Sequence, residues 1–416
     1  MPDYIHVEVE VAQSSKKAGM PCGDVVRWRR SNFGTNLVCA DGLGSGMRAH
    51  ISAEMCVARL FTAIEQGISL RKTFSSVASQ MEKSRDPKKP FAAFSLLRIR
   101  PDGNATILSY DAPPPILVNK NGASILANRI FPLPGGLAIE SNYQLQCGEG
   151  IMLMSDGITQ SGIGYGPNTE WTSEGVVKMI NELLSRRMNF ALIPQRIHQE
   201  SLQRWQGIVE RGKSPSTQNR SFSPYSQDAA RAAAAPYTHK VVGDDCSVLL
   251  AHCRTGQTVN IFTGPPMDKG QDEKYIKQFV ETSGLKIVCG GTTAKIIAKY
   301  LGVPLEMEQE PVSVIAPPRY GIRGVNLVTE GAVTLNQVYN VLDEDISKLN
   351  DDSGVTELRL LLNVADRINF MVGCAENKAN DDISFLQRGV LSRKVLVPLL
   401  AEKLEKEGKL VNVTYF

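Results

Sequence analysis

Three apolar segments of this 416-residue chain run directly into aspartate, and this pattern restricts the fold more than any other feature of the sequence. The segments are VCADGLGSG, LMSDGITQSG and VVGDDCSVLL, and their acids are Asp41, Asp156, Asp244 and Asp245. A further acid, Asp24 in MPCGDVVRW, stands at the beginning of a strand-like run. We expect carboxylates at strand ends to converge at one edge of a sheet. Like charges a few ångströms apart raise each other's pKa, so such a cluster repels itself unless cations occupy it.

The predicted cations are hard divalent ions with oxygen ligands and retained waters, which means magnesium or manganese. Glycine after Asp41 lets the backbone carbonyl approach a metal closely, because a side chain would obstruct it. Taken singly, each motif has an ordinary structural explanation. Asp-Gly is among the commonest turn dipeptides, and an Asp-Asp pair beside a strand is usually a solvated end. The metal-site interpretation therefore depends on the order and spacing of all four motifs together.

Composition sets the outer limits on what the chain is. Its length predicts two or three domains, and 42% hydrophobic with 21% charged residues excludes wholesale disorder. The 46 Lys and Arg against 43 Asp and Glu leave a charge of +3, which predicts no nucleic-acid binding. No uncharged run of about 18 apolar residues occurs, and acids stand among the first apolar residues. We therefore expect no membrane span, no signal peptide and a cytoplasmic protein. The eight cysteines contain no C-x-x-C pair and are expected to be reduced, buried thiols.

Periodicity predicts the elements of the first 255 residues. A half-buried strand over 5–12 alternates strictly, and a hairpin over 91–110 turns at 101–104. Apolar residues at three- and four-residue spacing predict helices over 47–64, 70–82, 173–186 and 191–211. A serine-, proline- and alanine-rich stretch at about 212–237 has no apolar face, so it predicts a flexible, protease-sensitive insertion.

A domain boundary is predicted near residue 255, which separates residues 1–255 from residues 256–416. The second part indicates repeated strand–loop–helix units and ends in an apolar strand, LVNVTYF. Its expected helical stretches are 271–283, 333–342, 355–372 and 394–407. These elements predict a smaller, separate α/β domain.

Two loops of this second part stand at predicted strand ends, TGPP at 263–266 and GGTT at 290–293. The backbone amides of GGTT are candidates for binding an anion with help from the helix dipole. Alternatively, Thr292 or Thr293 is a simple N-cap of the helix. We predict that this domain binds a regulatory partner or a small anion, with a purely structural extension as the alternative.

The order of the acidic motifs resembles that of the metal-dependent protein phosphatases (PPM, type 2C), and within them the bacterial SpoIIE-type branch. The corresponding residues here are Gly23-Asp24, Asp41-Gly42-Leu43-Gly44-Ser45-Gly46, Ser155-Asp156-Gly157 and Asp244-Asp245. The resemblance covers about residues 4–253. It implies an αββα sandwich with a centre of two Mn²⁺ or Mg²⁺ ions at one edge of the sheets.

The resemblance also implies a role for each acid. Asp41 would bridge both ions, and the Gly42 carbonyl would complete one of them. Asp156 and Asp244 would hold the other ion, with Asp24 contributing directly or through water. A metal-bridging water would then attack phosphorus in line, with Asp41, Asp156 and Asp244 as the catalytic residues. The metal ligands implied in this way are Asp24, Asp41, Gly42, Asp156, Asp244 and Asp245, the last either as a ligand or as a neighbouring acceptor.

This chain departs from the animal enzymes of the superfamily at two places. Leu43 stands where those enzymes carry a histidine in DGHGG, so the leaving-group proton must come from water or from another group. An early arginine that grips phosphate in the animal branch has no clear counterpart. We expect Arg27, Arg29 and Arg30 to be surface charge rather than a phosphate clamp. His50 is expected to be a partly exposed helix residue.

These expectations favour a serine/threonine phosphatase that acts on a phosphorylated bacterial signalling protein and is regulated by its appended domain. By the resemblance, the helices at about 46–66 and 70–82 would act as a switch that couples partner binding to the metal site. A catalytically weak partner-binding module and a hydrolase of small phosphate esters are the alternatives. The retention of four motif acids argues against the module. The sequence leaves the oligomeric state open, a dimer included.

Overall fold

A computed structural model gives the structure of residues 4–82, 91–133, 136–163, 170–213, 243–309, 319–346, 349, 353–375 and 390–416. Contacts divide the chain into two compact units. We call residues 7–29 and 33–254 the N-terminal unit, and residues 1–6, 30–32 and 255–416 the C-terminal unit. From residue 214 on, the insertion predicted at about 212–237 lies outside the described residues.

The N-terminal unit is built on two antiparallel sheets. In spatial order, one contains β1 (Ile5–Ser14), β11 (Cys246–Thr255), β10 (Gly150–Met154), β6 (Ile116–Asn119) and β7 (Gly122–Ile125). The other contains β2 (Asp24–Ser31), β3 (Gly34–Gly42), β4 (Ala92–Ile99), β5 (Asn104–Tyr110), β9 (Gly136–Gln144) and β8 (Arg129–Leu133). The hairpin predicted over 91–110 is the β4–β5 pair, which is confirmed.

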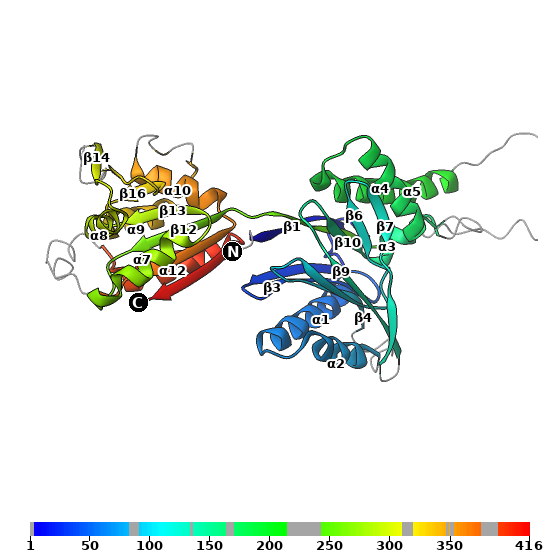
Figure 1. The fold of residues 1–416 in the computed structure, drawn as a ribbon. Helices are drawn as coiled ribbons and strands as arrows, with labels where there is room; N and C mark the ends of the chain where they lie inside the picture. The colour runs from blue at the N-terminus through cyan, green and yellow to red at the C-terminus, as the bar shows by residue number, and fades with distance from the viewer. Residues whose placement is uncertain are drawn as a thin grey trace, which may run out of the picture. The chain divides into compact units, whose positions relative to one another are not determined.

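Helices cover the outer face of each sheet (Figure 1). They are α1 (Met47–Glu65) and α2 (Leu70–Glu82) on the second sheet, and α4 (Thr172–Ser185) and α5 (Ile193–Lys213) on the first. The predicted helices over these segments are confirmed within a few residues. Strand alternation explains the layers: Val38 of β3 packs against α1, whereas its neighbour Leu37 is buried on the opposite face.

The C-terminal unit contains one sheet with helices on both faces. In spatial order its strands are β14 (Glu306–Gln309), β15 (Arg319–Gly321), β16 (Leu327–Thr329), β13 (Leu285–Cys289), β12 (Thr258–Thr263), β17 (Arg367–Val372) and β18 (Leu410–Tyr415). The helices are α7 (Asp272–Glu281) and α8 (Gly291–Leu301) on one face, and α9 (Ala332–Val341), α10 (Gly354–Val364) and α12 (Arg393–Lys406) on the other. The strands from β16 to β18 are parallel. The predicted αββα sandwich with a smaller α/β domain is confirmed.

The helix predicted over 355–372 is wrong in its second half. Helix α10 ends at Val364, and residues Arg367–Val372 form strand β17 between β12 and β18. The run RINFMV is short and apolar, and periodicity alone does not separate a buried strand from a helix in such a run. Parallel pairing on both sides decides the outcome.

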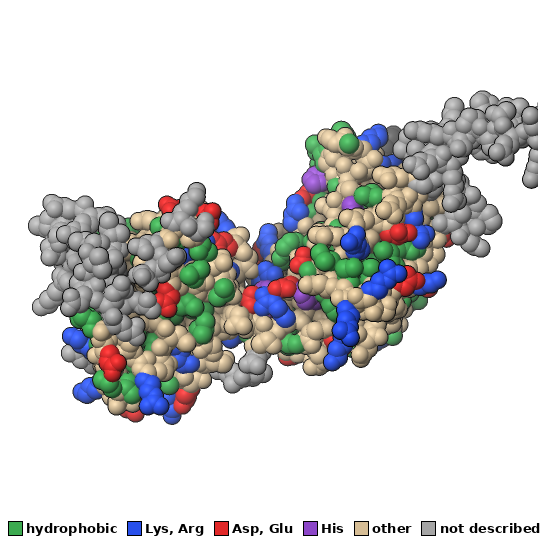
Figure 2. All heavy atoms as spheres, turned by 90° about the horizontal axis from the view of Figure 1, so that it is seen from above, with side chains coloured by type: hydrophobic (Ala, Val, Ile, Leu, Met, Phe, Trp, Pro, Cys, Tyr) green, Lys and Arg blue, Asp and Glu red, His purple; other side chains and the backbone are tan. Residues whose placement is uncertain are grey.

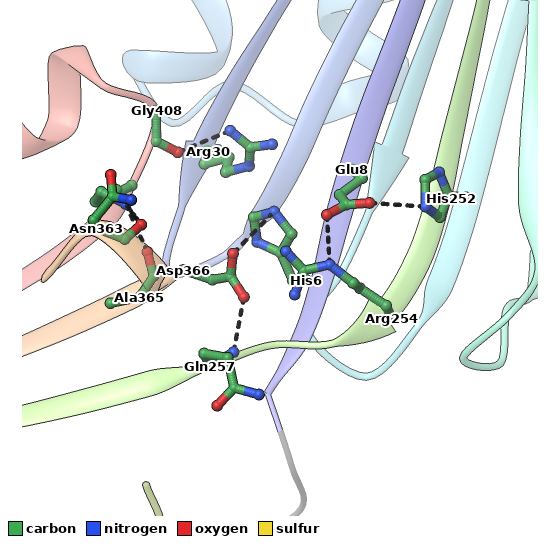
Figure 3. A network of polar contacts seen from close by, with 11 residues as sticks. His6, Glu8, Arg30, His252, Arg254, Gln257, Asn363, Ala365, Asp366 and Gly408 are labelled. Carbon is green, nitrogen blue, oxygen red and sulfur yellow. Dashed lines mark hydrogen bonds and ion pairs between the residues drawn. The ribbon is translucent and has the colours of Figure 1, made fainter. Parts of the chain in front are cut away.

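Polar contacts around Asp366 fix the turn that precedes β17 (Figure 3). Its Oδ2 accepts a hydrogen bond from the backbone N–H of Gln257 at 2.8 Å, and its Oδ1 lies 3.6 Å from Nε2 of His6. In the N-terminal unit, Glu8 of β1 forms an ion pair with His252 of the neighbouring β11 at 2.9 Å. These side chains support the starts of β12 and β17 and the pairing of β1 with β11.

The surface agrees with the near balance of charges in the sequence. Basic and acidic side chains intermingle on the face that Figure 2 shows. Within the described ranges, no helix combines the length and apolar character needed to cross a membrane.

Candidate active site

Strand alternation places two of the predicted acids together on the second sheet. Asp41 follows the buried Leu37 and Cys39 along one face of β3, and Asp24 is the first residue of the adjacent strand β2. The backbone N–H of Gly42 donates to the carbonyl of Gly23 at 3.3 Å, which joins the two motifs directly. The first two acidic motifs therefore lie side by side.

The other three acids lie at the meeting ends of two strands of the first sheet. Asp156 follows β10, and Asp244 and Asp245 precede β11, its antiparallel neighbour. The backbone N–H of Ser155 donates to the carbonyl of Ser247 at 2.9 Å, so the two chain ends are in register here. The two sheets thus bring one pair and one triplet of acids to the same end of the sandwich.

The electrostatics of the acids show that the two groups are close to one another. Burial raises the pKa of Asp41 well above its usual range, and the carboxylates of Asp24, Asp156 and Asp244 raise it further. Burial also raises the pKa of Asp244; the charge of Asp156 adds to this increase, while Lys16 and the backbone N–H of Asp245 oppose it. Acids from both sheets therefore form one cluster.

Asp24 is the most deeply placed member of this cluster, with 2% of its surface exposed. Neither of its carboxylate oxygens has a hydrogen-bond partner among the described residues. Burial raises its pKa to about 6; the hydroxyls of Ser155 and Ser247 oppose this shift from nearby but do not reach hydrogen-bond geometry. Asp245 resembles it in part: Oδ1 accepts from the backbone N–H of Lys16 at 2.8 Å, whereas the buried Oδ2 has no partner in the described part of the chain.

Glycines of the motifs allow this close approach. A Cβ on Gly23 would stand 2.7 Å from Oδ2 of Asp245. On Gly42 it would stand 2.0 Å from the carbonyl oxygen of Ala49 in α1, and on Gly157 it would stand 2.0 Å from the carbonyl oxygen of Asp245. Real Cβ atoms are not found at such distances. Glycine is thus required by packing at all three positions.

A cleft of about 670 Å³ opens beside the cluster, with Asp41 and Asp156 in its lining. The other lining residues are Leu43, Phe91, Ala93, Asp111, Pro113, Pro114, Thr159, Gln160, Glu170, Thr172, Ser173 and Glu174. Gln160 donates from Nε2 to Oδ2 of Asp156 at 3.0 Å and so holds that carboxylate in place. Asp41 and Asp156 are therefore the members of the cluster that face the cleft.

Arg27 and Arg29, which lie near the first motif in the sequence, do not line the cleft. Arg27 pairs with Glu54 at 2.6 Å, and Arg29 pairs with Glu65, both acids on α1. The prediction of surface charge is confirmed for Arg27 and Arg29, whereas Arg30 is half-buried and donates to the carbonyl of Gly408 at 2.8 Å. His50, which is half-buried as expected, places Nδ1 2.9 Å from the carbonyl oxygen of Cys22, next to the first motif.

Sequence reasoning missed several residues that shape the site. Lys16 is 229 positions from Asp245, and nothing in the sequence joins them. Asp111 and Thr172 line the cleft with positive φ angles of 55° and 59°, which side chains other than glycine rarely adopt. Gln160, one turn after Asp156, was within reach of an i, i+4 argument.

The donor set of the cluster fits hard divalent cations. Five carboxylates lie together, some of their buried oxygens have no hydrogen bond, and burial with mutual repulsion raises the pKa of Asp24 and Asp41; bound Mg²⁺ or Mn²⁺ would relieve this cost. Across the ranges described, no three His, Cys, Asp or Glu side chains form a ready-made metal-holding group.

The stability of the metal-free protein provides a first test of this cluster. The folded-state pKa of Asp24, about 6, lies above its ordinary value of 3.8. Stability should therefore fall as pH rises between these two values. In EDTA, we expect Asp24→Asn to raise the free energy of unfolding at pH 8, on the order of 2 kcal/mol, and to change it little at pH 4. Urea unfolding at both pH values measures this effect.

Asp102→Asn is the matched control, because Asp102 lies in the exposed turn between β4 and β5. It should leave the stability unchanged at either pH. An Asp24→Asn protein that is less stable than the unsubstituted protein at pH 8 in EDTA would contradict the repulsion inferred here.

Comparison with known proteins finds a similarity over part of the chain. Residues 31–211 match the family model of stage II sporulation protein E (SpoIIE), a segment that contains Asp41 and Asp156. No curated protein matches the sequence. The similar solved structures include the PP2C phosphatase domain with a fragment of the regulatory domain of SpoIIE from Bacillus subtilis, at 16% identity and a TM-score of 0.43. That alignment covers 61% of this chain and 65% of the other, so the chain spans less than two thirds of that relative.

Two further solved structures are similar to this chain. The RsbU and RsbW domains of a Mycobacterium tuberculosis protein align at 14% identity over 67% of this chain and 69% of the other, with a TM-score of 0.41. The SiaA PP2C domain of Pseudomonas aeruginosa aligns at 13% identity over 59% and 85%, with a TM-score of 0.39. The comparisons therefore show that residues 31–211, with Asp41 and Asp156 among them, are similar to the SpoIIE family.

Proposed function

We propose that the N-terminal unit hydrolyses phosphoserine or phosphothreonine on a protein, with two Mn²⁺ or Mg²⁺ ions held by the acidic cluster. The observation that carries this proposal is the convergence of five carboxylates from both sheets beside a cleft of about 670 Å³. Burial and mutual repulsion oppose the charges of such a cluster, so the cluster lowers the stability of the protein when no cation is bound. Clusters of this kind are therefore candidates for functional sites.

The proposed role of each acid follows from its position relative to the cleft. Asp41 and Asp156 face the cleft and would hold the ions on the substrate side. Asp24, Asp244 and Asp245 lie behind or beside them and would complete the ligand set, with the Gly42 carbonyl. When bound, the ions would supply a water of lowered pKa and neutralise charge on the phosphoryl oxygens.

Other groups of the chain orient this set. Gln160 fixes Asp156 through its hydrogen bond, and the backbone of Lys16 fixes Asp245. Leu43 lines the cleft where a histidine would be placed to protonate the leaving group, so this proton would come from solvent. Apolar walls formed by Phe91 and Pro113 would exclude part of the water from the reacting phosphate.

The direct test is phosphate release from phosphoserine and phosphothreonine peptides by the full-length protein. We expect activity with Mn²⁺ or Mg²⁺ that is lost in EDTA and restored by added metal. Equal turnover in EDTA would contradict metal-dependent hydrolysis. Turnover of p-nitrophenyl phosphate without any peptide turnover would favour a small-ester hydrolase. Absence of all turnover would favour the partner-binding module.

A further inference from the structure

The central strands of the C-terminal sheet end side by side in glycine. The register pairs Thr263 of β12 with Cys289 of β13 on one side and with Val372 of β17 on the other. The residues that follow these three are Gly264, Gly290 and Gly373. The strand order also reverses at this place, since β13 and β16 lie on one side of β12 while β17 and β18 lie on the other. Open α/β sheets bind ligands outside the carboxyl ends of their strands at such a reversal.

A cation lies at this reversal. A Cβ on Gly264 would stand 2.1 Å from Nη1 of Arg393, so the guanidinium of α12 rests on the bare backbone after β12. Its Nη2 donates to the carbonyl of Ala375, after β17, at 3.3 Å. Arg393 therefore bridges the two loops at the reversal. Burial lowers the pKa of Arg393, which reflects the cost of holding a cation here. A bound anion would offset this cost.

Two helices direct uncapped amino ends to the same edge. Helix α8 begins after Gly290 and α12 begins after Ser392; neither N-cap makes a side-chain hydrogen bond, and neither first turn contains an acid. The N–H groups of Val395 and Leu396 donate to the carbonyl of Ser392, and that of Ala294 donates to the carbonyl of Gly290. The N–H groups that precede them and the helix dipoles favour an anion. Helix α9 differs, because the Glu330 carboxylate interacts with backbone N–H groups of its first turn.

The cap of α8 corrects the expectation for GGTT. Neither Thr292 nor Thr293 caps the helix, because Gly290 with a φ of 127° occupies the N-cap position and Thr293 is buried within the first turn. Only glycine adopts such a φ readily. The amides of the first turn are thereby left for another partner.

An unpartnered hydroxyl adds an independent sign of a ligand. Thr263 is fully buried, and its Oγ1 has no hydrogen-bond partner among the described residues. Alternation along β12 places Thr263 on the face of Val259 and Ile261, which pack in one cluster with residues of α12. The hydroxyl thus lies at the strand end, on the side from which Arg393 approaches. A buried hydroxyl without a partner costs stability.

We propose that this edge binds the phosphate group of a small phosphorylated molecule. Arg393 supplies the positive fork, the first-turn amides of α8 and α12 donate hydrogen bonds, and the Thr263 hydroxyl adds a further donor. Arginine with several N–H donors is the arrangement that phosphate oxygens prefer. The site belongs to the C-terminal unit and is separate from the hydrolytic centre.

Calorimetric titration of the full-length protein tests this assignment. The protein carries Asp41→Asn and is kept in EDTA, so that the acidic cluster does not bind the probes. The probes are ADP, pyrophosphate and orthophosphate. We expect Arg393→Gln to weaken binding about tenfold or more. Lys394→Gln is the matched control, because Lys394 is the exposed neighbour of Arg393 in the same turn. The affinity of this variant for the probes should equal that of the protein without the substitution. Tighter binding of ADP would indicate a nucleotide, and equal binding of orthophosphate would indicate free phosphate.

Thr263→Val gives a second variant with a different signature. It keeps the shape of the side chain and removes the unpartnered hydroxyl, so the ligand-free melting temperature should stay the same or rise while affinity falls. A structural role alone would lower the melting temperature and leave affinity unchanged. A lower melting temperature with unchanged affinity in Thr263→Val would overturn the proposal. Equal affinity of the Arg393→Gln and Lys394→Gln proteins would do the same, as would the absence of saturable binding of any probe at millimolar concentration.

Discussion

Replacing Asp41 or Asp156 with asparagine is expected to lower metal-dependent phosphate release by about two to three orders of magnitude or more, the range seen when one electrostatic group is removed from a preorganised site. Both carboxylates line the cleft. The charge of Asp41 interacts with that of Asp156 and with those of Asp24 and Asp244. Asparagine keeps the volume and loses the charge that would hold a cation. Initial rates with phosphoserine peptide and Mn²⁺ measure the effect.

The folded state should survive these two substitutions. Circular dichroism and thermal unfolding in EDTA are expected to show an unchanged or higher melting temperature for Asp41→Asn, because removal of one carboxylate relieves repulsion within the cluster. Asp102→Asn, in the exposed β4–β5 turn, makes the same chemical change outside the cluster and should retain full activity. Near-normal turnover of either cluster variant with Mn²⁺ would refute the metal assignment.

The second large effect is expected from a single methyl group at Gly157. Its Cβ would stand 2.0 Å from the carbonyl oxygen of Asp245, so the loop that carries Asp244 and Asp245 must move away from Asp156. Gly157 is also tied by its own carbonyl, which accepts hydrogen bonds from Trp205 at 3.0 Å and from a serine of α5. We expect Gly157→Ala to lower the free energy of unfolding by about 1–3 kcal/mol, as overpacking does, and to abolish most of the activity.

Gly243→Ala is the control, because Gly243 precedes Asp244 in the same acidic motif and an added Cβ would meet no atom within 4 Å. Urea unfolding and peptide turnover should both be unchanged in that variant. Gly42→Ala extends the test to the other sheet, where the added Cβ would meet the Ala49 carbonyl of α1 at 2.0 Å. Full activity of Gly157→Ala, with normal stability, would show that the two motifs do not need this contact.

The position of α1 bears on regulation. Gly42 follows Asp41 directly and packs against the first turn of α1. Movement of this helix would therefore displace Asp41 and Gly42, which are both proposed ligands of the ions. The sequence resemblance predicts a switch in this helix and the next. A matched pair of measurements on Gly42→Ala, metal affinity and peptide turnover, would separate a shift in ion binding from a loss of chemistry.

The sequence by itself determined the parts of this protein that depend on local periodicity. Strict alternation predicted β1, and three- to four-residue spacing predicted α1, α2, α4 and α5, whereas β7, β8 and β9 were not predicted. The order of four acidic motifs pointed to the acids that the fold brings together. Each alternating or helical pattern lies within about 20 residues of chain, whereas the acidic motifs extend from Gly23 to Asp245. The sequence also indicated roles for the glycines after Asp41 and Asp156, as a close approach to a metal and as a turn residue, but not their contacts with Ala49 and Asp245.

Only the tertiary structure decided what depends on pairing between distant segments. The sequence predicts helix over β17 because a strand of six residues, four of them apolar, has no distinctive local pattern, and two parallel neighbours hold it as a strand. The buried, unpartnered oxygens of Asp24, the contact of Lys16 with Asp245 and the row of strand-end glycines beside Arg393 follow from register across the sheets. Register is set by packing of whole faces against one another, and a one-residue shift would turn every side chain to the other face.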